Sequence, residues 1–179
     1  MSWLRFMEFE TNRMPGPDHV LSAIALPDGA NALSLRPGFL IRRMHQIHLA
    51  LFAEECGAFD ITPVQYSIMT VAAAQPDLDQ AQLAVEVGVD RATLANVVAR
   101  LESKGLVRRR LLKSDKRVKL VALSPRGSAL LDQMRAAVQR AHDRTIEALS
   151  REDQSKLMEL LSKLVDAQND YGRAPLRLR

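Results

Sequence analysis

Residues 82–107 read QLAVEVGVDRATLANVVARLESKGLV, and this stretch decides the fold. Gly88 lies where a tight turn between two short helices needs a residue that tolerates a left-handed backbone. Asp90 is suited to cap the second helix, over residues 91–104, and Gly105 ends it. The inward face of that helix is predicted to carry four apolar side chains: Leu94, Val97, Val98 and Leu101. Two helices joined by a glycine turn in this way predict a helix-turn-helix.

A charged β-hairpin is predicted directly after these helices. Residues 107–112 and 118–123 are rich in Val and Leu, and residues 113–117, KSDKR, form the polar turn between them. A helix-turn-helix followed by a basic hairpin has the element order of a winged helix-turn-helix. We therefore expect a mainly α-helical fold with a small β-hairpin wing.

Two further helices are predicted ahead of this motif. Residues 37–57 form a long helix with two apolar stripes, one of Leu40, Met44, Ile47 and Leu51, the other of Ile41, His45, His48 and Phe52. A helix that is apolar on two sides is usually buried between two layers. Thr62 and Pro63 start the next helix, which ends near residue 74. Its predicted core-facing side chains are Val64, Ile68 and Val71.

Three more helices complete the expected order. Asp79 caps a short helix over residues 79–87, and Ser124 with Pro125 starts a long helix after the hairpin. Ser150 starts the last helix, which is predicted to bury four leucines: Leu157, Leu160, Leu161 and Leu164. The helices near the two chain ends carry more apolar surface than one lobe can cover, which favours a second copy of the chain as partner.

Positive charge is concentrated in one fifth of the sequence. Residues 91–126 contain eleven basic and two acidic side chains, a formal charge of +9, whereas the whole chain carries only +4. The remaining residues are therefore acidic overall. This distribution predicts a polyanion-binding surface over the second helix of the motif and the hairpin.

Composition argues against several classes of protein. The single cysteine, Cys56, excludes an intramolecular disulfide and a cysteine-rich zinc module. No uncharged apolar run approaches the length of a membrane helix, and charges interrupt the apolar residues at the N-terminus, unlike in a signal peptide. We find no phosphate-binding glycine loop and no pairing of a nucleophile with a base. We expect a cytoplasmic protein that is not an enzyme and holds no cofactor.

The sequence resembles the MarR family of bacterial transcription regulators. The resemblance is carried by QLAVEVGVDRATL at residues 82–94, VARLESKGLV at 98–107, SDKR at 114–117 and LSPRG at 123–127. These motifs are specific in combination, and the resemblance covers about residues 35–165. It implies an intertwined homodimer joined through its N- and C-terminal helices. It also implies a bacterial, nucleoid-associated protein that binds a pseudo-palindromic double-stranded DNA operator. Small anionic phenolic ligands commonly weaken such binding in this family.

The resulting domain assignment has four parts. Residues 1–34 form an N-terminal arm that is irregular or belongs to the dimer interface, and residues 171–179 form a basic tail. Residues 35–58 and 124–170 supply the dimerisation helices. Residues 60–123 form the winged helix-turn-helix lobe that binds DNA.

The expected DNA-binding residues lie on the second helix of the motif and in the wing. Arg91, Thr93, Asn96 and Arg100 point away from the core face, and such side chains read base edges in the major groove. Arg91 could instead contact a phosphate, and Arg100 could instead form a structural ion pair with Glu102 or with a neighbouring loop. The expected wing residues are Lys113, Asp115, Lys116 and Arg117. In wings of this family the arginine at the place of Arg117 enters the minor groove, and the aspartate at the place of Asp115 holds the loop.

An effector site is expected between the dimerisation helices and the winged lobe, as the family resemblance implies. Its candidate residues are Arg42, Arg43, His45, His48, Tyr66 and Met69. Arginine would pair with a carboxylate or phosphate, and the rings and Met would contact an apolar body. The expected effector is an aromatic carboxylate or its coenzyme A thioester. The other interpretation of these side chains is core and surface packing.

Three alternatives remain open from the sequence. The protein could bind DNA without an effector or without sequence specificity. His45 and His48 could hold a metal with Glu54 or Cys56, although two histidines are a weak signal. Cys56 could sense oxidation, but the neighbouring Glu54 and Glu55 should raise its pKa and disfavour the reactive thiolate.

Overall fold

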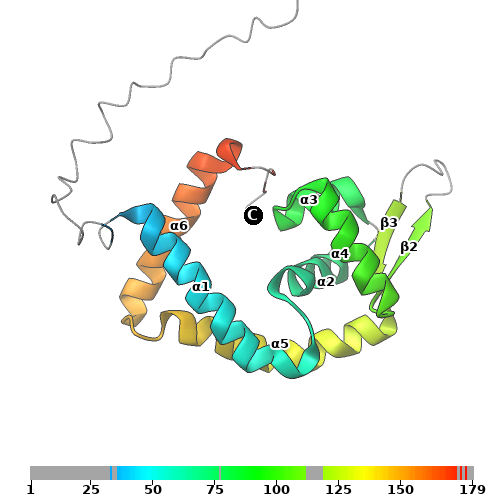
Figure 1. Cartoon of the computed structure of the whole chain (residues 1–179), viewed down its shortest axis with the longest axis horizontal. Helices are drawn as coiled ribbons and strands as arrows, with labels where there is room; N and C mark the ends of the chain where they lie inside the picture. The colour runs from blue at the N-terminus through cyan, green and yellow to red at the C-terminus, as the bar shows by residue number, and fades with distance from the viewer. Residues whose placement is uncertain are drawn as a thin grey trace, which may run out of the picture. The chain divides into compact units, whose positions relative to one another are not determined.

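The computed structural model describes residues 33, 36–76, 78–111, 119–172, 174 and 176. The chain divides between Arg43 and Met44 into two compact units. The helices and strands in chain order (Figure 1) are α1 (Pro37–Cys56), η3 (Gly57–Phe59), α2 (Pro63–Ala74), β1 (Leu78–Asp79), α3 (Gln80–Val87), α4 (Arg91–Ser103), β2 (Val107–Leu111), β3 (Lys119–Leu123), α5 (Pro125–Ile146), α6 (Arg151–Gln168) and η4 (Asn169–Tyr171). None of the described helices could span a membrane by its length and hydropathy.

The helix starts are where local side chains predict them. Thr62 caps α2 and Asp79 caps α3, each in a capping box in which the Gln three residues later binds the cap N–H in return. The other predicted caps are also confirmed: Asp90 for α4, Ser124 for α5 and Ser150 for α6. Each cap depends only on residues a few positions apart, so it can be predicted without knowing how the rest of the chain packs.

The helix-turn-helix is confirmed. Gly88 and Gly105 both have φ +70°, so the turn before α4 and the end of α4 use the left-handed backbone that glycine allows. Leu94, Val98 and Leu101 are fully buried on the inward face of α4, while Val97 is half-buried. They join a core that includes Ile68, Met69, Leu83, Val121 and Met134.

The predicted hairpin is present, and a third short strand extends it. β2 and β3 pair antiparallel, with Val107 opposite Leu123 and Leu111 opposite Lys119. The sheet order is β1-β3-β2, and β1 pairs antiparallel with β3 through Leu78 opposite Val121. Two residues are too few to show a period, so the sequence did not predict β1.

The core face of α2 differs from the prediction at one position. Val64 is 37% exposed, whereas Gln65 beside it is buried. The side chain of Gln65 accepts a hydrogen bond from the Thr62 N–H at 3.0 Å, so its amide is held inward by the capping box. Ile68 is buried as predicted, and Val71 is half-buried.

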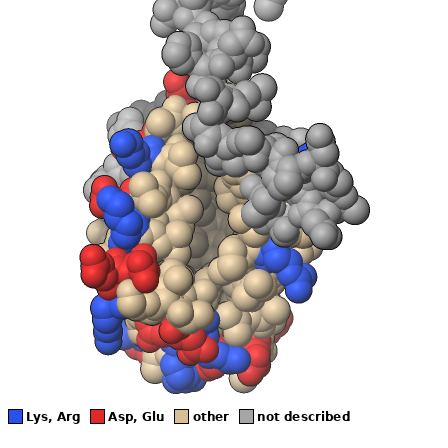
Figure 2. All heavy atoms as spheres, turned by 90° about the vertical axis from the view of Figure 1, so that its left-hand side faces the viewer, with Lys and Arg blue, Asp and Glu red and all other residues tan. Residues whose placement is uncertain are grey.

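Burial of the last helix was wrongly predicted for a single chain. On α6, Leu160, Leu161 and Leu164 are 46%, 39% and 55% exposed, and Leu157 is only half-buried. Figure 2 shows a broad area of uncharged side chains on one face of the molecule, with charged side chains at its margins. The physical reason is that none of the elements that the structure describes in this chain covers the apolar side of α6.

The first long helix is likewise only partly covered. Of its two predicted apolar stripes, Phe52 is buried, but Leu40, Ile41, Met44 and Ile47 are exposed. The buried end of α1 is bound to α5 by hydrogen bonds. The Glu55 carboxylate of α1 accepts one from Arg140 Nε and one from Arg144 Nη1 of α5, both at 2.8 Å. These hydrogen bonds hold the pKa of Glu55 below its usual value.

Gly127 fills a position where no side chain fits. It lies in the first turn of α5, is buried, and a β-carbon there would be 2.1 Å from the Leu106 carbonyl oxygen and 2.8 Å from Leu123 Cδ1. The Leu106 oxygen also accepts from the Ser124 N–H at 3.0 Å, so the backbone around it is fixed.

We predict that Gly127→Ala lowers the free energy of unfolding by at least about 2 kcal/mol, because overpacking against backbone cannot be relieved by a rotamer change. Urea unfolding at fixed protein concentration measures this. Gly57→Ala is the matched control, since nothing lies within 4 Å of a β-carbon at Gly57. Equal stability of the two variants would contradict the close approach.

Candidate DNA-binding surface and effector site

The outward face of α4 brings together three of the four predicted base-reading residues. Thr93, Asn96 and Arg100 are exposed and spaced i, i+3 and i+7, so they share one side of the helix. Arg91 is also exposed but is set apart from them. It lines a cavity of about 370 Å³ with residues of α3, including Gln82 and Glu86.

Thr93 is fixed by the cap of its own helix. Its N–H donates to Asp90 Oδ1 at 2.8 Å and its hydroxyl donates to Oδ2 at 2.6 Å. Both bonds hold the pKa of Asp90 below its ordinary value, with the hydroxyl contributing most. The Thr93 hydroxyl proton is therefore committed, which leaves its methyl group and an oxygen lone pair to meet a base.

Glu102 binds Arg109, not Arg100 as one alternative expected. One Glu102 oxygen accepts from the Arg109 N–H at 3.0 Å, and the other accepts from Arg109 Nε at 2.8 Å and from Nη2. This contact lowers the pKa of Glu102 and raises that of Arg109. The last turn of α4 is thus joined to β2 by a bidentate ion pair.

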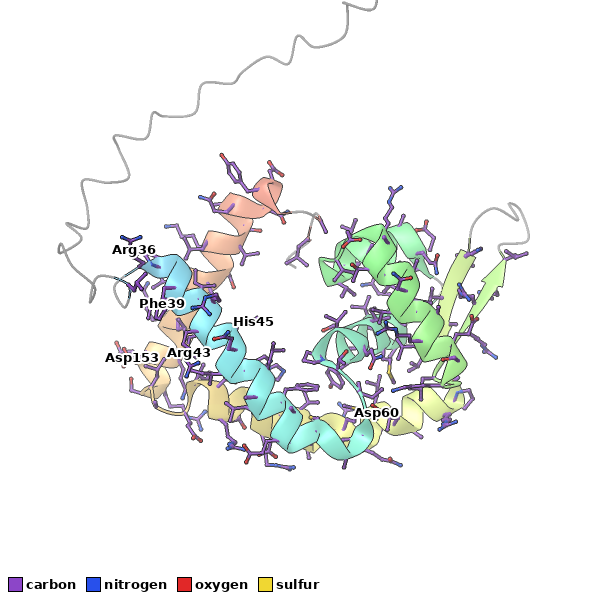
Figure 3. All side chains as sticks on the ribbon, in the orientation of Figure 1. Arg36, Phe39, Arg43, His45, Asp60 and Asp153 are labelled. Carbon is purple, nitrogen blue, oxygen red and sulfur yellow. The ribbon has the colours of Figure 1, made fainter. Side chains whose placement is uncertain are left out.

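A second ion pair anchors the other side of the end of α4. Lys104 Nζ donates to the Asp60 carbonyl oxygen at 2.6 Å and to Asp60 Oδ2 at 2.8 Å. Asp60 has φ 52°, a left-handed conformation that aspartate adopts more readily than most residues. Asp60 lies in the connection between α1 and α2 (Figure 3), so α4 is tied to that connection as well as to the sheet.

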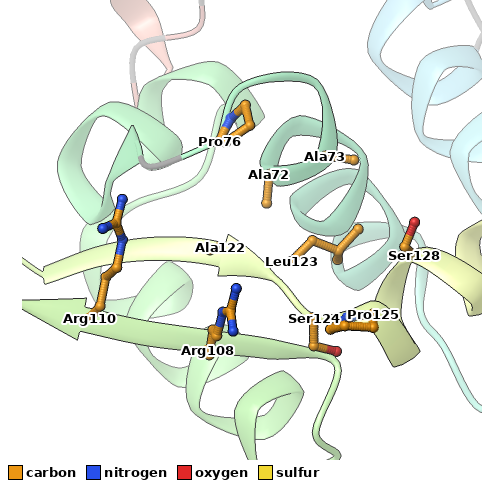
Figure 4. A pocket seen from close by; sticks show the side chains of 10 residues that line it. All are labelled: Ala72, Ala73, Pro76, Arg108, Arg110, Ala122, Leu123, Ser124, Pro125 and Ser128. Atoms are coloured by element: carbon orange, nitrogen blue, oxygen red, sulfur yellow. The ribbon is translucent and has the colours of Figure 1, made fainter.

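The arginines of β2 face opposite sides of the sheet, as a strand requires. Arg108 and Arg110 both line a cavity of about 540 Å³ (Figure 4). By the alternation of the strand, Arg109 faces the other side. Its other lining residues are Ala72, Ala73, Pro76, Ala122, Leu123, Ser124, Pro125 and Ser128. Two guanidinium groups over a small apolar floor suit an anion. The alternation of the arginines could be predicted from the sequence, but the cavity could not.

The wing tip lies outside the described residues. Lys113, Asp115, Lys116 and Arg117 all fall within 112–118, for which the structure gives no description. Their assigned roles therefore remain expectations from the sequence. The same holds for most of the arm over residues 1–34.

Two of the predicted effector residues lie in one row of aromatic rings. The ring centroid of His48 on α1 lies 6.4 Å from that of Phe52, and the Phe52 centroid lies 6.4 Å from that of Tyr66 on α2. His142 of α5 stacks on His48 at 5.2 Å. The row therefore crosses three helices. The sequence did not link His142 to His48, because only the packing of α1 on α5 aligns them.

The hydrogen bonds of His48 define its tautomer. The Thr145 hydroxyl donates to the Ala141 carbonyl oxygen at 2.7 Å, so its oxygen accepts from His48 Nδ1, 2.9 Å away. Burial lowers the pKa of His48 below 6.5, and His142 and His45 lower it further. At neutral pH His48 is therefore an uncharged ring with its proton on Nδ1 and an acceptor lone pair on Nε2.

The other predicted effector residues are placed differently. Met69 is fully buried in the core, and Arg42 lies over the Phe39 ring, 5.3 Å from its centroid. Arg43 and His45 are exposed on α1 (Figure 3). None of these four side chains lines the cavity at Arg91, the cavity at Arg108 and Arg110, or the third cavity, near Asp60 and Lys104.

Cys56 is placed where it is poorly reactive. The side chain is 1% exposed, and burial together with the Glu55 carboxylate raises the pKa of its thiol. Among the residues the structure describes, no group of three or more His, Cys, Asp or Glu side chains could hold a metal ion.

A third cavity, of about 690 Å³, lies between the Asp60–Lys104 contact and the start of α5 and includes Arg126.

Comparisons with known proteins agree on one class. The sequence model of the MarR family matches residues 61–119. The transcriptional regulator HosA of Escherichia coli O111:H- is 32% identical over 127 residues, 71% of this chain and 93% of HosA. The HTH-type transcriptional repressor NicR of Pseudomonas putida is 27% identical over 135 residues, 75% of this chain and 85% of NicR.

Solved structures are similar over most of the chain. Bordetella bronchiseptica BpsR, whose DNA binding is regulated by 6-hydroxynicotinic acid, matches with TM-score 0.73 and 26% identity over 78% of this chain and 98% of BpsR. The repressor CouR bound to a 23-mer DNA duplex matches with TM-score 0.72 and 26% identity over 78% and 99%. CouR from Rhodococcus jostii bound to p-coumaroyl-CoA matches with TM-score 0.65 and 29% identity over 74% and 93%.

We predict that the stability of the protein falls as pH decreases through about 6.5, in part because of His48. Its lowered pKa means that the folded state binds a proton less readily than the unfolded chain, so stability is retained above the unfolded pKa and lost below it. Urea unfolding between about pH 7.5 and 5.5 should show a smaller loss for His48→Gln than for the wild type. Gln46→Ala, an uncharged change at an exposed position of the same helix, is the control. Identical pH profiles of wild type and His48→Gln would contradict this origin.

Proposed function

The chain belongs to the MarR family of transcription regulators, and we propose that it is a homodimeric repressor released from its operator by a small anionic aromatic molecule. Its relatives are DNA-binding regulators, not enzymes. The observation that carries the proposal is the exposed face of α4, where Thr93, Asn96 and Arg100 lie within the segment 91–126 of formal charge +9.

Dimerisation is supported by the apolar surface that one chain leaves open. Exposed side chains on α6 include Met158, Leu160, Leu161, Leu164 and Val165. Contiguous apolar side chains of this kind mark protein–protein contacts. In a two-fold dimer, two copies of α4 would meet the major groove about one helical turn apart, so half-site centres should be about 10 base pairs apart.

Direct base reading is assigned to the outward face of α4. Asn96 presents an amide that can make two hydrogen bonds to adenine, Arg100 suits guanine or phosphate, and the Thr93 methyl group suits thymine. The ion pairs of Glu102 with Arg109 and of Lys104 with Asp60 hold the helix that presents them. We assign Arg117 to the minor groove, with Lys113 and Lys116 at phosphates and Asp115 ordering the wing loop.

The aromatic row at His48 is the proposed seat of the effector. A neutral ring with an acceptor at Nε2 suits a phenol or other N–H or O–H donor, and Phe52 and Tyr66 suit a planar ring. The similarity to BpsR and CouR supports an aromatic acid or its coenzyme A thioester as the ligand class. Within this class we assign Arg42 or Arg43 to the acidic group.

Binding of the purified protein to its own upstream DNA at fixed salt tests the proposal. The titration is repeated with aromatic carboxylates and their coenzyme A thioesters. Specific binding that one compound releases is the expected result. Specific binding that none of them disturbs would overturn the effector class and leave the DNA assignment in place. Equal affinity for operator and unrelated DNA would overturn sequence specificity itself.

We predict that Asn96→Ala relaxes base preference at one position in each half-site and costs about 1–3 kcal/mol of binding free energy on the preferred operator. Selection from a randomised operator library measures the preference. Ser103→Ala is the control, since Ser103 is exposed on the same helix but its hydroxyl binds the Arg100 carbonyl. An unaltered selection profile for Asn96→Ala would remove it from base reading.

A further inference from the structure

The cavity of about 690 Å³ lies where three parts of the winged lobe meet: the connection after α1, the end of α4 and the start of α5. Its volume is in the range of cavities that hold small molecules. The described residues that line it include none from the aromatic row at His48. It is therefore a separate place from the proposed seat of the effector.

One wall of this cavity is a single face of α5. Arg126, Ala129, Leu130 and Gln133 all line it, and their spacing of i, i+3, i+4 and i+7 puts them on the same side of the helix. Residues seven positions apart in an α-helix are about 10 Å apart along its axis. The wall thus carries a cation near one end, an amide near the other and apolar side chains between them.

The facing side of the cavity is largely apolar. Phe59, Ile61 and Leu106 line it, and Ile61 and Leu106 are buried while Phe59 is half-buried. Cavities lined in this way, with a few polar groups among apolar side chains, are typical of sites for small organic molecules.

The Arg126 guanidinium lies beside the end of α4 without binding to it. A β-carbon at Gly105 would be 3.8 Å from Arg126 Nη1, yet the carbonyl oxygens of Leu101, Glu102 and Gly105 already accept hydrogen bonds from other groups. Among the residues that the structure describes, none forms a hydrogen bond or an ion pair with this guanidinium. Its N–H donors are therefore open to an acceptor that enters the cavity.

Lys104 supplies a second cation to the same cavity. Its ammonium donates to the carbonyl oxygen and to Oδ2 of Asp60, and an ammonium has one more donor than these two bonds use. Asp60 also lines the cavity, and its side chain is 91% exposed. An ion pair this exposed is weak, so an anion in the cavity can compete with the Asp60 carboxylate for Lys104.

We propose that this cavity binds a small organic anion whose carboxylate or phosphate is held by Arg126 and Lys104. The body of the ligand lies along Leu130 and the apolar lining, and a polar group at its far end reaches Gln133. By taking Lys104 from the Asp60 carboxylate, the ligand replaces one of the contacts that hold the end of α4. The inference goes beyond the proposed repressor function, because it concerns a second small-molecule site that needs no DNA.

The test uses 6-hydroxy-2-naphthoate, a rigid fluorescent molecule with a carboxylate at one end and a hydroxyl at the other. Its fluorescence anisotropy is followed as the full chain is added without DNA. Arg126→Gln should weaken binding by about tenfold or more, because it removes a charge-assisted hydrogen bond. Arg135→Gln, the same change at an exposed position further along α5, is the matched control and should bind as the wild type does.

A second variant tests the cavity without changing its charge. Ala129→Leu places a larger side chain in the wall of α5 and should weaken binding of the probe by about tenfold. Ala136→Leu is the matched control, since Ala136 is exposed on the same helix and does not line the cavity. Ala129 is also exposed, so neither change should prevent folding.

The competition for Lys104 has its own variant. Asp60→Asn removes the competing negative charge but keeps a residue that tolerates the φ of 52° at this position. The probe should therefore bind several-fold more tightly to Asp60→Asn than to the wild type. Equal or weaker binding would overturn the proposed competition.

The polar far end of the site is tested with 2-naphthoate, which lacks the hydroxyl. It should bind more weakly than the probe to the wild type, and the two should bind equally to Gln133→Ala. A difference that persists in Gln133→Ala would contradict the assignment of Gln133.

The remaining outcomes separate this site from the other proposals. No binding of the probe, or equal affinity for wild type, Arg126→Gln and Ala129→Leu, overturns the cavity site and leaves the repressor proposal in place. Loss of binding only in His48→Gln would assign the probe to the aromatic row and also overturn it. Displacement of the probe by inorganic phosphate as readily as by 2-naphthoate would reduce the site to a simple anion contact, against the proposal.

Discussion

The junction of four chain segments at Ser124 is the constraint on which the rest of the structure depends. The Ser124 hydroxyl donates to the Gly105 carbonyl oxygen at 2.7 Å and accepts from the Gly127 N–H, and its own N–H binds the Leu106 oxygen. The end of α4, the start of β2, the end of β3 and the start of α5 therefore meet at one point. Because Gly127 has no side chain, the first turn of α5 packs directly against the Leu106 backbone that follows α4.

The basic side chains of the lobe are of two kinds: some form ion pairs that hold α4 in place, and others are exposed on its outward face. Arg109 and Lys104 have carboxylate partners and hold α4 to the sheet and to the α1–α2 connection. Arg100, on the outward face of the same helix, is exposed. Ion pairs this exposed add little to stability, so their value lies in orienting α4. A helix held at both sides keeps the spacing between the side chains that we propose read the bases, and fixed geometry of that kind favours specificity.

The sequence was sufficient where local chemistry decides the structure. Thr62, Asp79 and Asp90 mark helix starts through bonds to residues only three positions away, and so their helices were predicted correctly. It was insufficient where distant contacts decide. Gln65 is buried and Val64 exposed because of the rotation of α2 about its axis. Glu102 pairs with Arg109 because of the path of β2. The leucines of α6 are exposed because nothing in the described part of this chain covers them. The wing and effector assignments stay predictions.

The burial of Cys56 has a consequence for how the molecule can be observed. Its thiol is the only one in the chain, and it is enclosed at the end of α1 near the Glu55 contacts with α5. A thiol-directed reagent can reach it only when this end of α1 separates from its neighbours, so the rate of labelling follows a local opening event and not the surface chemistry of the protein. The labelling rate of Cys56 therefore reports how often the contact between α1 and α5 opens.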